Sequence, residues 1–166
     1  MEINEIIDLL GLEPLPEEGG FFRQTHKAKG IIPAEALPNH NGPRAYSTAI
    51  YYLVTPESFS ALHLVAQNEM FHFYLGDPVE MIQIEPTGEL TKHIIGNDLA
   101  AGQRPQVLAP ADVWQGTRLV EGGKWALLGC TVSPGFEFDD FVLKSRAELT
   151  KLFPQHATAI AKYTHG

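Results

Sequence analysis

Three residues whose side chains can bind or transfer protons lie close together in this chain: His63, Glu69 and His72. The segment that holds them, from Ser60 to Gly76, is otherwise rich in apolar and aromatic residues. Ionisable groups are costly in such surroundings unless another group pairs with them. Two imidazoles and a carboxylate in an apolar setting therefore indicate a candidate site for proton transfer or ligand binding.

Strand alternation divides this group. In a regular strand, Glu69 shares one face with Phe71 and Phe73, whereas His72 lies on the other face. Glu69 and His72 can point into one cavity only if a bulge intervenes. We therefore predict His63 and Glu69 as the catalytic pair, with the His63 ring as hydrogen-bond donor to the carboxylate. We place His72, Phe71 and Phe73 among the ligand-binding residues; the structural alternatives are a core histidine for His63 and a packed surface or subunit interface for His72.

Further ligand-binding candidates come from polar and aromatic side chains elsewhere. Gln115 follows a proline turn and offers a donor and an acceptor without charge, which suits a hydroxyl or an amide, although it could also be an exposed polar residue. Tyr51 and Trp114 could stack on a sugar or a base, although most aromatic residues at strand spacing are core. Arg23, like Arg44 and Arg104, is a candidate clamp for a phosphate or carboxylate, unless it is solvated or ion-paired at the surface.

A succession of short strands must position these residues. The apolar patterns and the turn signals between them predict strands near 21–26, 45–54, 59–66, 69–75, 79–84, 89–95, 106–109, 113–119 and 124–132. Many short strands with evenly spaced turns are typical of a sandwich or barrel. Residues 30–44 contain several prolines and glycines and are expected to form a long loop.

Short helices are expected at both ends. Apolar residues at helical spacing predict a helix over 3–10, which Gly11 would end. Ser145 and Glu148 form a capping box, so a helix should begin there and stop before Pro154. A last short helix is expected within 155–163. The 166 residues fit one domain, with its core at about 12–153.

Composition narrows the class of partner. The net charge of -8 argues against nucleic acid and anionic membranes. No run approaches the roughly 18 apolar residues of a membrane span, and the first residues lack the basic region of a signal peptide. Cys130 is the only cysteine, so no disulfide forms within the chain, and a cytoplasmic location is expected. The partner that we expect is a small-molecule ligand of the candidate site.

Two motifs resemble those of the cupins. Glu69 and Gly76 stand at the Glu-x6-Gly spacing of the first cupin motif, and residues 110–115 resemble the second motif, Pro-x-Gly-x-x-His. More closely, the chain resembles a small uncharacterised family, the cupin_5 type, within the RmlC-like cupins. That resemblance covers about residues 12–153 and rests on segments 18–21, 48–53, 60–63, 69–74, 76–78, 102–106 and 129–136. It implies an all-β double-stranded β-helix (a jelly roll) with short N- and C-terminal helices, and usually a homodimer.

The chain departs from the metal-binding cupins. Those proteins typically hold their ion with a His-x-His pair, a glutamate and a histidine of the second motif. Here His63 stands alone, Gln115 replaces the second-motif histidine, and Asp112 replaces its glycine. His63 and Glu69 are too few to hold a divalent ion tightly, unless His72 or Gln115 turns inward. A divalent metal is therefore disfavoured, and no cofactor is expected.

Three functions are compatible with these residues. The first is a cupin that binds a small polar metabolite, sugar- or nucleotide-like, and acts as a metal-independent epimerase or isomerase. His63 would be its base, oriented by Glu69, and the tyrosine acid for the opposite face is not identified. The second is a metal-dependent dioxygenase or isomerase with His63, Glu69 and His72 around the ion. The third is a binding module without chemistry.

Overall fold

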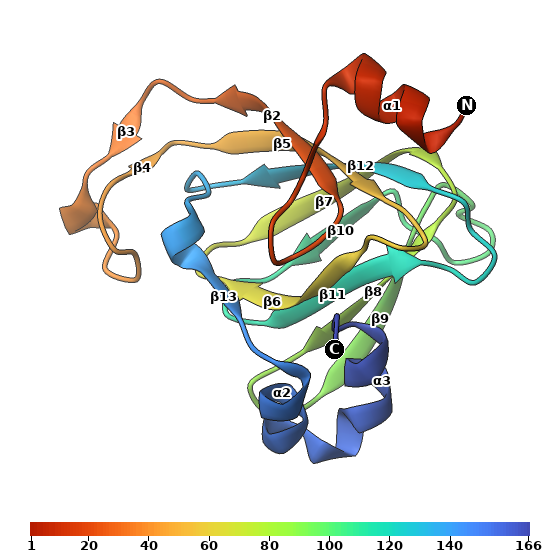
Figure 1. The fold of residues 1–166 in the computed structure, drawn as a ribbon. Helices are drawn as coiled ribbons and strands as arrows, with labels where there is room; N and C mark the ends of the chain where they lie inside the picture. Colours follow the sequence, from red (N-terminus) through yellow and green to blue (C-terminus); the bar gives the residue numbers. More distant parts are fainter.

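A computed structural model describes residues 1–166, and its main elements are antiparallel strands in two facing sheets (Figure 1). The strands are β1 (Glu13–Pro14), β2 (Phe21–Lys27), β3 (Ile31–Ile32), β4 (Arg44–Ala45), β5 (Thr48–Val54), β6 (Ser60–Val65), β7 (Glu69–Gly76), β8 (Val79–Ile84), β9 (Leu90–Ile95), β10 (Gln106–Ala109), β11 (Trp114–Leu119), β12 (Ala126–Val132) and β13 (Phe141–Leu143). The helices are α1 (Ile3–Leu10), α2 (Arg146–Leu152) and α3 (Ala157–Lys162), with 3-10 turns η1 (Ala34–Ala36), η2 (Phe138–Asp140) and η3 (Pro154–His156).

The sheet topology is that of a jelly roll, so the predicted fold class is confirmed. One sheet has six strands in the order β1-β2-β5-β12-β7-β10, and the other has five in the order β13-β6-β11-β8-β9. The predicted strands lie within a few residues of the observed ones, and both predicted terminal helical regions are present. Strands β1 and β13 were not predicted, and the expected loop over 30–44 also holds the short β3–β4 pair.

The main core lies between the two sheets. The core forms because side chains alternate between the two faces of each strand, and the inward side chains of β5, β7, β8 and β12 pack together between the sheets. Its largest members are fully or almost fully buried, and include Tyr52, Phe71, Met81, Ile95 and Leu128. Tyr52, Phe71 and Cys130 of this core also border a cavity.

The terminal helices pack against the outer faces of the sheets and cover part of them (Figure 1). Ile6 of α1 packs with Leu53 and Leu127 on the six-stranded sheet. Helices α2 and α3 bury Leu149 and Ile160 beneath the five-stranded sheet. The predicted capping box begins α2: Ser145 Oγ accepts from the Glu148 amide at 3.2 Å, and the Glu148 carboxylate accepts from the Ser145 amide at 2.8 Å. None of the helices is long and apolar enough to cross a membrane.

Candidate functional site

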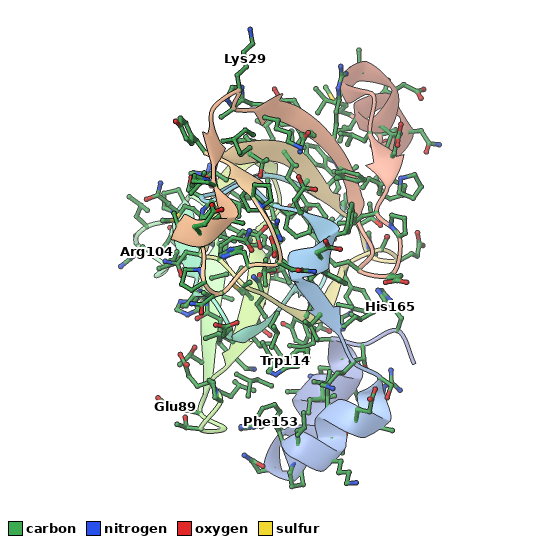
Figure 2. All side chains as sticks on the ribbon, turned by 90° about the vertical axis from the view of Figure 1, so that its left-hand side faces the viewer. Lys29, Glu89, Arg104, Trp114, Phe153 and His165 are labelled. Carbon is green, nitrogen blue, oxygen red and sulfur yellow. The ribbon has the colours of Figure 1, made fainter.

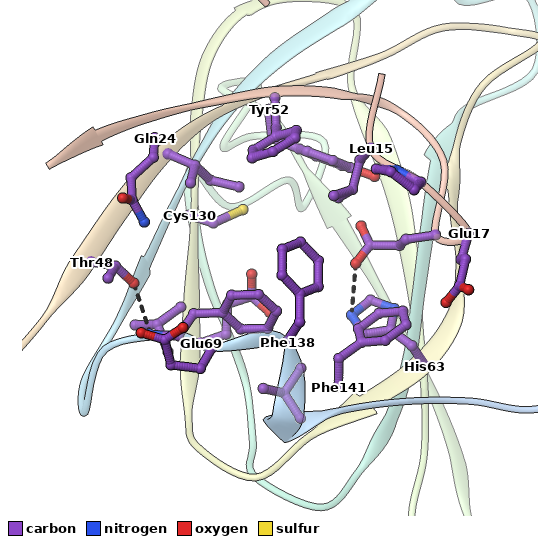
Figure 3. Close-up of a pocket in the computed structure, with 18 of the residues that line it drawn as sticks. Leu15, Glu17, Gln24, Thr48, Tyr52, His63, Glu69, Cys130, Phe138 and Phe141 are labelled. Carbon is purple, nitrogen blue, oxygen red and sulfur yellow. Dashed lines mark hydrogen bonds and ion pairs between the residues drawn. The ribbon is translucent and has the colours of Figure 1, made fainter. Parts of the chain in front are cut away.

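A cavity of about 510 Å³ is lined by strands of both sheets (Figure 3). This volume lies within the usual range of small-molecule pockets. Its wall is largely apolar and contains five phenylalanines. Figure 3 shows His63 and Phe141 on one side of the pocket and Gln24 and Thr48 on the other. The lining residues are Leu15, Pro16, Glu17, Glu18, Phe22, Gln24, Lys27, Thr48, Ile50, Tyr52, His63, Val65, Glu69, Phe71, Cys130, Val132, Phe136, Glu137, Phe138 and Phe141.

The buried ring of His63 is held at both nitrogens. Its Nδ1 lies 2.7 Å from the carbonyl oxygen of Ala61, which can only accept, so Nδ1 carries a hydrogen. Its Nε2 lies 3.4 Å from Oε1 of Glu18. Because Nδ1 carries the hydrogen, Nε2 is the basic nitrogen of the ring, and the Glu18 carboxylate would stabilise a proton taken up there. The ring also stacks on Phe141, with 5.1 Å between ring centroids.

Glu18 reaches His63 because the loop before β2 turns sharply. Gly19 and Gly20 have φ angles of +98° and +76°, a backbone conformation that residues with a Cβ atom rarely adopt. A Cβ at Gly19 would also collide with the carbonyl oxygen of Phe59. The Tyr52 hydroxyl donates to the Gly19 carbonyl at 2.6 Å, and Ser60 Oγ donates to the second Glu18 oxygen at 3.1 Å. The loop is therefore fixed so that its carboxylate enters the pocket.

Glu69 is the second acidic group deep in the pocket. Its Oε2 accepts from Nε2 of Gln115 at 3.2 Å. Burial raises its pKa to about 7, against the opposing influence of His63, while Glu18 raises it further. The neighbouring Cys130 thiol is also buried, which raises its pKa well above the ordinary value and keeps it protonated. Glu69 is thus the carboxyl of the pocket that changes its protonation near neutral pH.

These contacts correct one expectation and add one residue. His63 was predicted to donate to Glu69, but Gln115 donates to Glu69 and His63 pairs with Glu18. Glu18 was not among the predicted site residues, because it comes from a loop distant in sequence. The signal that could have found it is an acidic residue directly before the Gly19-Gly20 pair.

A segment between β12 and α2 forms part of the pocket wall. It contributes Phe136, Phe138 and Phe141, and Phe138 lies near the middle of the pocket in the view of Figure 3. Asp140 of the same segment accepts from Arg44 at 2.7 and 2.8 Å, with both side chains almost completely buried. Gln67 Nε2 also donates to Asp140, at 2.9 Å. This buried ion pair links β4 to the segment of residues 136–141, which we call the wall segment.

Three predicted ligand-binding residues lie outside the pocket, together on the outer face of the six-stranded sheet. Tyr51 and His72 both stand opposite Gly129 in the register, and Tyr74 contacts both of them. His72 Nε2 contacts the Thr131 hydroxyl at 2.9 Å. Arg23 pairs with Tyr51 in the register and donates to a carbonyl of α1. Alternation explains this: the neighbours of inward residues point outward.

The remaining predicted residues divide between pocket and core. Phe71 lines the pocket, whereas Phe73 packs beside the main core. Trp114 lies between the five-stranded sheet and the C-terminal helices, as Figure 2 shows near Phe153. Gln115 points to the opposite face, toward Glu69. Arg104 is at the surface, away from the pocket (Figure 2).

The polar groups of the pocket do not fit the metal sites of cupins. Nowhere do three or more histidine, cysteine, aspartate or glutamate side chains gather so that they could hold an ion. His63 Nε2 faces Glu18, and His72 lies on the other side of its strand. The turn of the second motif is nevertheless kept: Asp112 adopts a φ of 59°, the left-handed conformation that glycine favours and aspartate tolerates.

The fold and these motifs agree with the comparisons to known proteins. A family model described as "Cupin superfamily (DUF985)" matches residues 4–144. The chain belongs to this cupin family. A structure of protein SO0799 from Shewanella oneidensis has 34% identity to this cupin and a TM-score of 0.90, covering 99% of this chain and 98% of that one. A hypothetical protein from Leishmania major has 26% identity and a TM-score of 0.90, covering 100% of both chains.

A curated relative is similar over most of its length. "Uncharacterized protein YML079W" of Saccharomyces cerevisiae is 28% identical over 155 residues, which are 87% of this chain and 77% of that protein. None of these three names states an activity or a ligand. The family therefore establishes the fold of this cupin, and evidence for its activity and ligand comes from its own residues.

Proposed function

We propose that this cupin binds a small metabolite in the pocket and moves a proton on it without a metal, as an isomerase or epimerase does. The observation that carries the proposal is the His63–Glu18 pair: a buried imidazole whose Nε2 faces a carboxylate at 3.4 Å, at the wall of a cavity. Such a pair takes up a proton from a carbon next to a carbonyl. A ligand of the pocket needs a polar end for these groups and an apolar body for the phenylalanines.

Glu69 supports the second half of the reaction. An epimerase must return a proton to the carbon from a different group. Tyr52 is unsuitable, because its hydroxyl already donates to Gly19 and its burial raises its pKa well above the ordinary value. Glu69, with a pKa of about 7, is partly protonated at neutral pH and can give up this proton. The proton count then balances: the His63–Glu18 pair gains one, and Glu69 loses one.

The alternative is a binding module, and proton exchange distinguishes the two. The protein would be incubated in deuterium oxide with a panel of small aldehydes and ketones, and NMR would measure deuterium entry next to the carbonyl. We expect exchange of at least one compound above its rate in buffer, and a loss of about 100-fold or more in His63→Gln. His72→Gln, on the outer face, is the matched control and should exchange like the wild type. Exchange that is equal in wild type and His63→Gln contradicts the proposal.

We also infer that two copies associate and that they act in a reducing compartment such as the cytoplasm. Exposed apolar and aromatic side chains on the six-stranded sheet, Tyr74 and Leu108 among them, support the association. The single cysteine, Cys130, is buried, and this suits a compartment where thiols stay reduced.

A further inference from the structure

The charges around the pocket are unevenly matched. Four carboxylates line it, those of Glu17, Glu18, Glu69 and Glu137, and no arginine does. The lysine of the wall, Lys27, is already paired with Glu137 at 3.0 Å. His63 is paired with Glu18. Glu17 and Glu69 therefore have no cationic partner in the pocket, and the wall is acidic around an apolar interior.

A buried acceptor beside Glu69 also lacks a donor. Gln115 is only 2% exposed; its Nε2 donates to Glu69, and its Oε1 has no hydrogen-bond partner. Gln115 stands opposite His63 in the strand register, so both side chains leave the sheet on the same face. Buried polar atoms in native proteins are nearly always satisfied. A buried acceptor without a donor, beside a carboxyl group without a cationic partner, indicates that a hydrogen-bond donor belongs there.

We propose that the pocket selects a ligand whose polar end is a protonated amine, carried on an apolar body about the size of an aromatic ring. The ammonium group would donate toward Glu69, which lines the pocket in front of Gln115, and would be attracted by the faces of the surrounding phenylalanines. Phosphates and carboxylates would meet like charge instead, with no arginine to bind them. This inference rests on the proposed function in using the same pocket, and it names the substrate class. The ammonium group binds the ionised form of Glu69, so with such a substrate the His63–Glu18 pair both takes up the proton and returns it, as in a one-base isomerase.

The wall segment strengthens this assignment. Phe138 and Phe141 belong to the pocket wall on the same segment as Glu137, so apolar and acidic groups reach the ligand together. An apolar amine satisfies both kinds of surface, whereas a sugar would leave the phenylalanines facing hydroxyls. The cavity of about 510 Å³ has room for such a molecule.

Three small molecules that share a phenyl ring and differ in their polar end test whether the pocket prefers an amine. Isothermal titration at pH 7.5 would compare 2-phenylethylamine, 2-phenylethanol and phenylacetate, which carry a cation, a neutral hydroxyl and an anion. We expect the amine to bind about ten-fold more tightly than the alcohol, and phenylacetate to bind weakest. Phenylacetate binding as tightly as the amine overturns the proposal, and so does an amine that fails to saturate the protein at about 10 mM.

A pair of glutamate-to-glutamine variants tests whether Glu69 causes the preference for the amine. Glu69→Gln should remove most of the ten-fold preference for the amine while leaving the affinity for 2-phenylethanol within about two-fold. Glu89→Gln, at an exposed position outside the pocket, is the control and should change neither. The amine should also bind more tightly as the pH rises through 7, because Glu69 then loses its proton. Preference unchanged in Glu69→Gln overturns the assignment.

The outcome is separable from that of the proton-transfer proposal. His63→Gln should abolish deuterium exchange yet keep the preference for the amine over phenylacetate. If no deuterium exchange is found but the amine still binds more tightly than phenylacetate, the isomerase proposal is contradicted and the proposed ligand class is supported. If exchange is found but phenylacetate binds more tightly than the amine, the proposed ligand class is contradicted and the isomerase proposal is supported.

Discussion

At the scale of single residues, the unusual electrostatics of the pocket centre on Glu69. An ordinary glutamate has a pKa of 4.5, whereas burial raises the pKa of Glu69 to about 7. A carboxyl whose pKa is raised by folding favours the folded state at low pH. This contribution is fully present below about pH 4.5, is lost as the pH rises from about 4.5 to 7, and stays constant above that.

Replacement of Glu69 by glutamine should remove this pH dependence. The amide keeps an acceptor for Gln115 but does not ionise, so its burial has no charge penalty at high pH. We expect Glu69→Gln to be more stable than wild type at pH 8 by about 1–2 kcal/mol, and the two to converge near pH 4.5. Urea unfolding across this range measures the difference. A variant that is less stable than wild type at pH 8 would contradict the raised pKa.

The chemistry of single residues was only partly predictable from the sequence. Strand alternation was enough to put His63 and Glu69 on inward faces. It could not supply the partner of His63, because Glu18 arrives from a loop whose path depends on two left-handed glycines. It also could not show that Tyr51 and Trp114 face away from the pocket, because alternation fixes relative faces but not which face is covered.

At the scale of elements, the wall segment around η2 depends on two ion pairs of different kinds. Arg44 and Asp140 are almost completely buried, whereas Lys27 and Glu137 are 49% and 43% exposed. Burial alone would raise the pKa of Asp140, but hydrogen bonds from Arg44 and Gln67 hold it below its ordinary value. The pair therefore stabilises the fold at neutral pH and loses this contribution only in acid.

Breaking the two pairs should have unequal effects. Asp140→Ala leaves the Arg44 guanidinium buried without its partner and should cost about 3–5 kcal/mol. Lys27→Ala breaks an exposed pair on the same segment and should cost less than about 1 kcal/mol. The midpoints of urea unfolding at pH 7 give both values. Equal losses would mean that the buried pair does not hold the segment.

The elements themselves were largely readable from the sequence. Turn signals such as Gly76-Asp77-Pro78 separated strands that the structure places within a few residues of prediction. Strand β13 escaped notice because it has three residues and is defined by pairing with β6, a long-range contact. The β3–β4 pair is shorter still, and it lies in a stretch whose prolines and glycines indicated only a loop.

At the scale of the whole molecule, one face of the six-stranded sheet stays uncovered. Helix α1 covers the part of that sheet near Leu53 and Leu127, but Tyr74 is 45% exposed and Leu108 is 42% exposed. Leu108 belongs to β10, the edge strand, where unpaired backbone groups also invite association. Exposed apolar and aromatic residues beside a free edge are typical of an interface between protein chains.

We therefore expect a homodimer that this face holds together. Light scattering at micromolar concentration should give about twice the chain mass of 18.3 kDa. Leu108→Glu would place a charge in the interface of each copy and should shift the mass to that of the monomer, because an unpaired buried charge costs several kcal/mol. Leu9→Glu, at an exposed position on α1, is the control and should stay dimeric. A wild-type mass of 18.3 kDa would contradict the dimer, and a dimer that persists in Leu108→Glu would move the interface to another face.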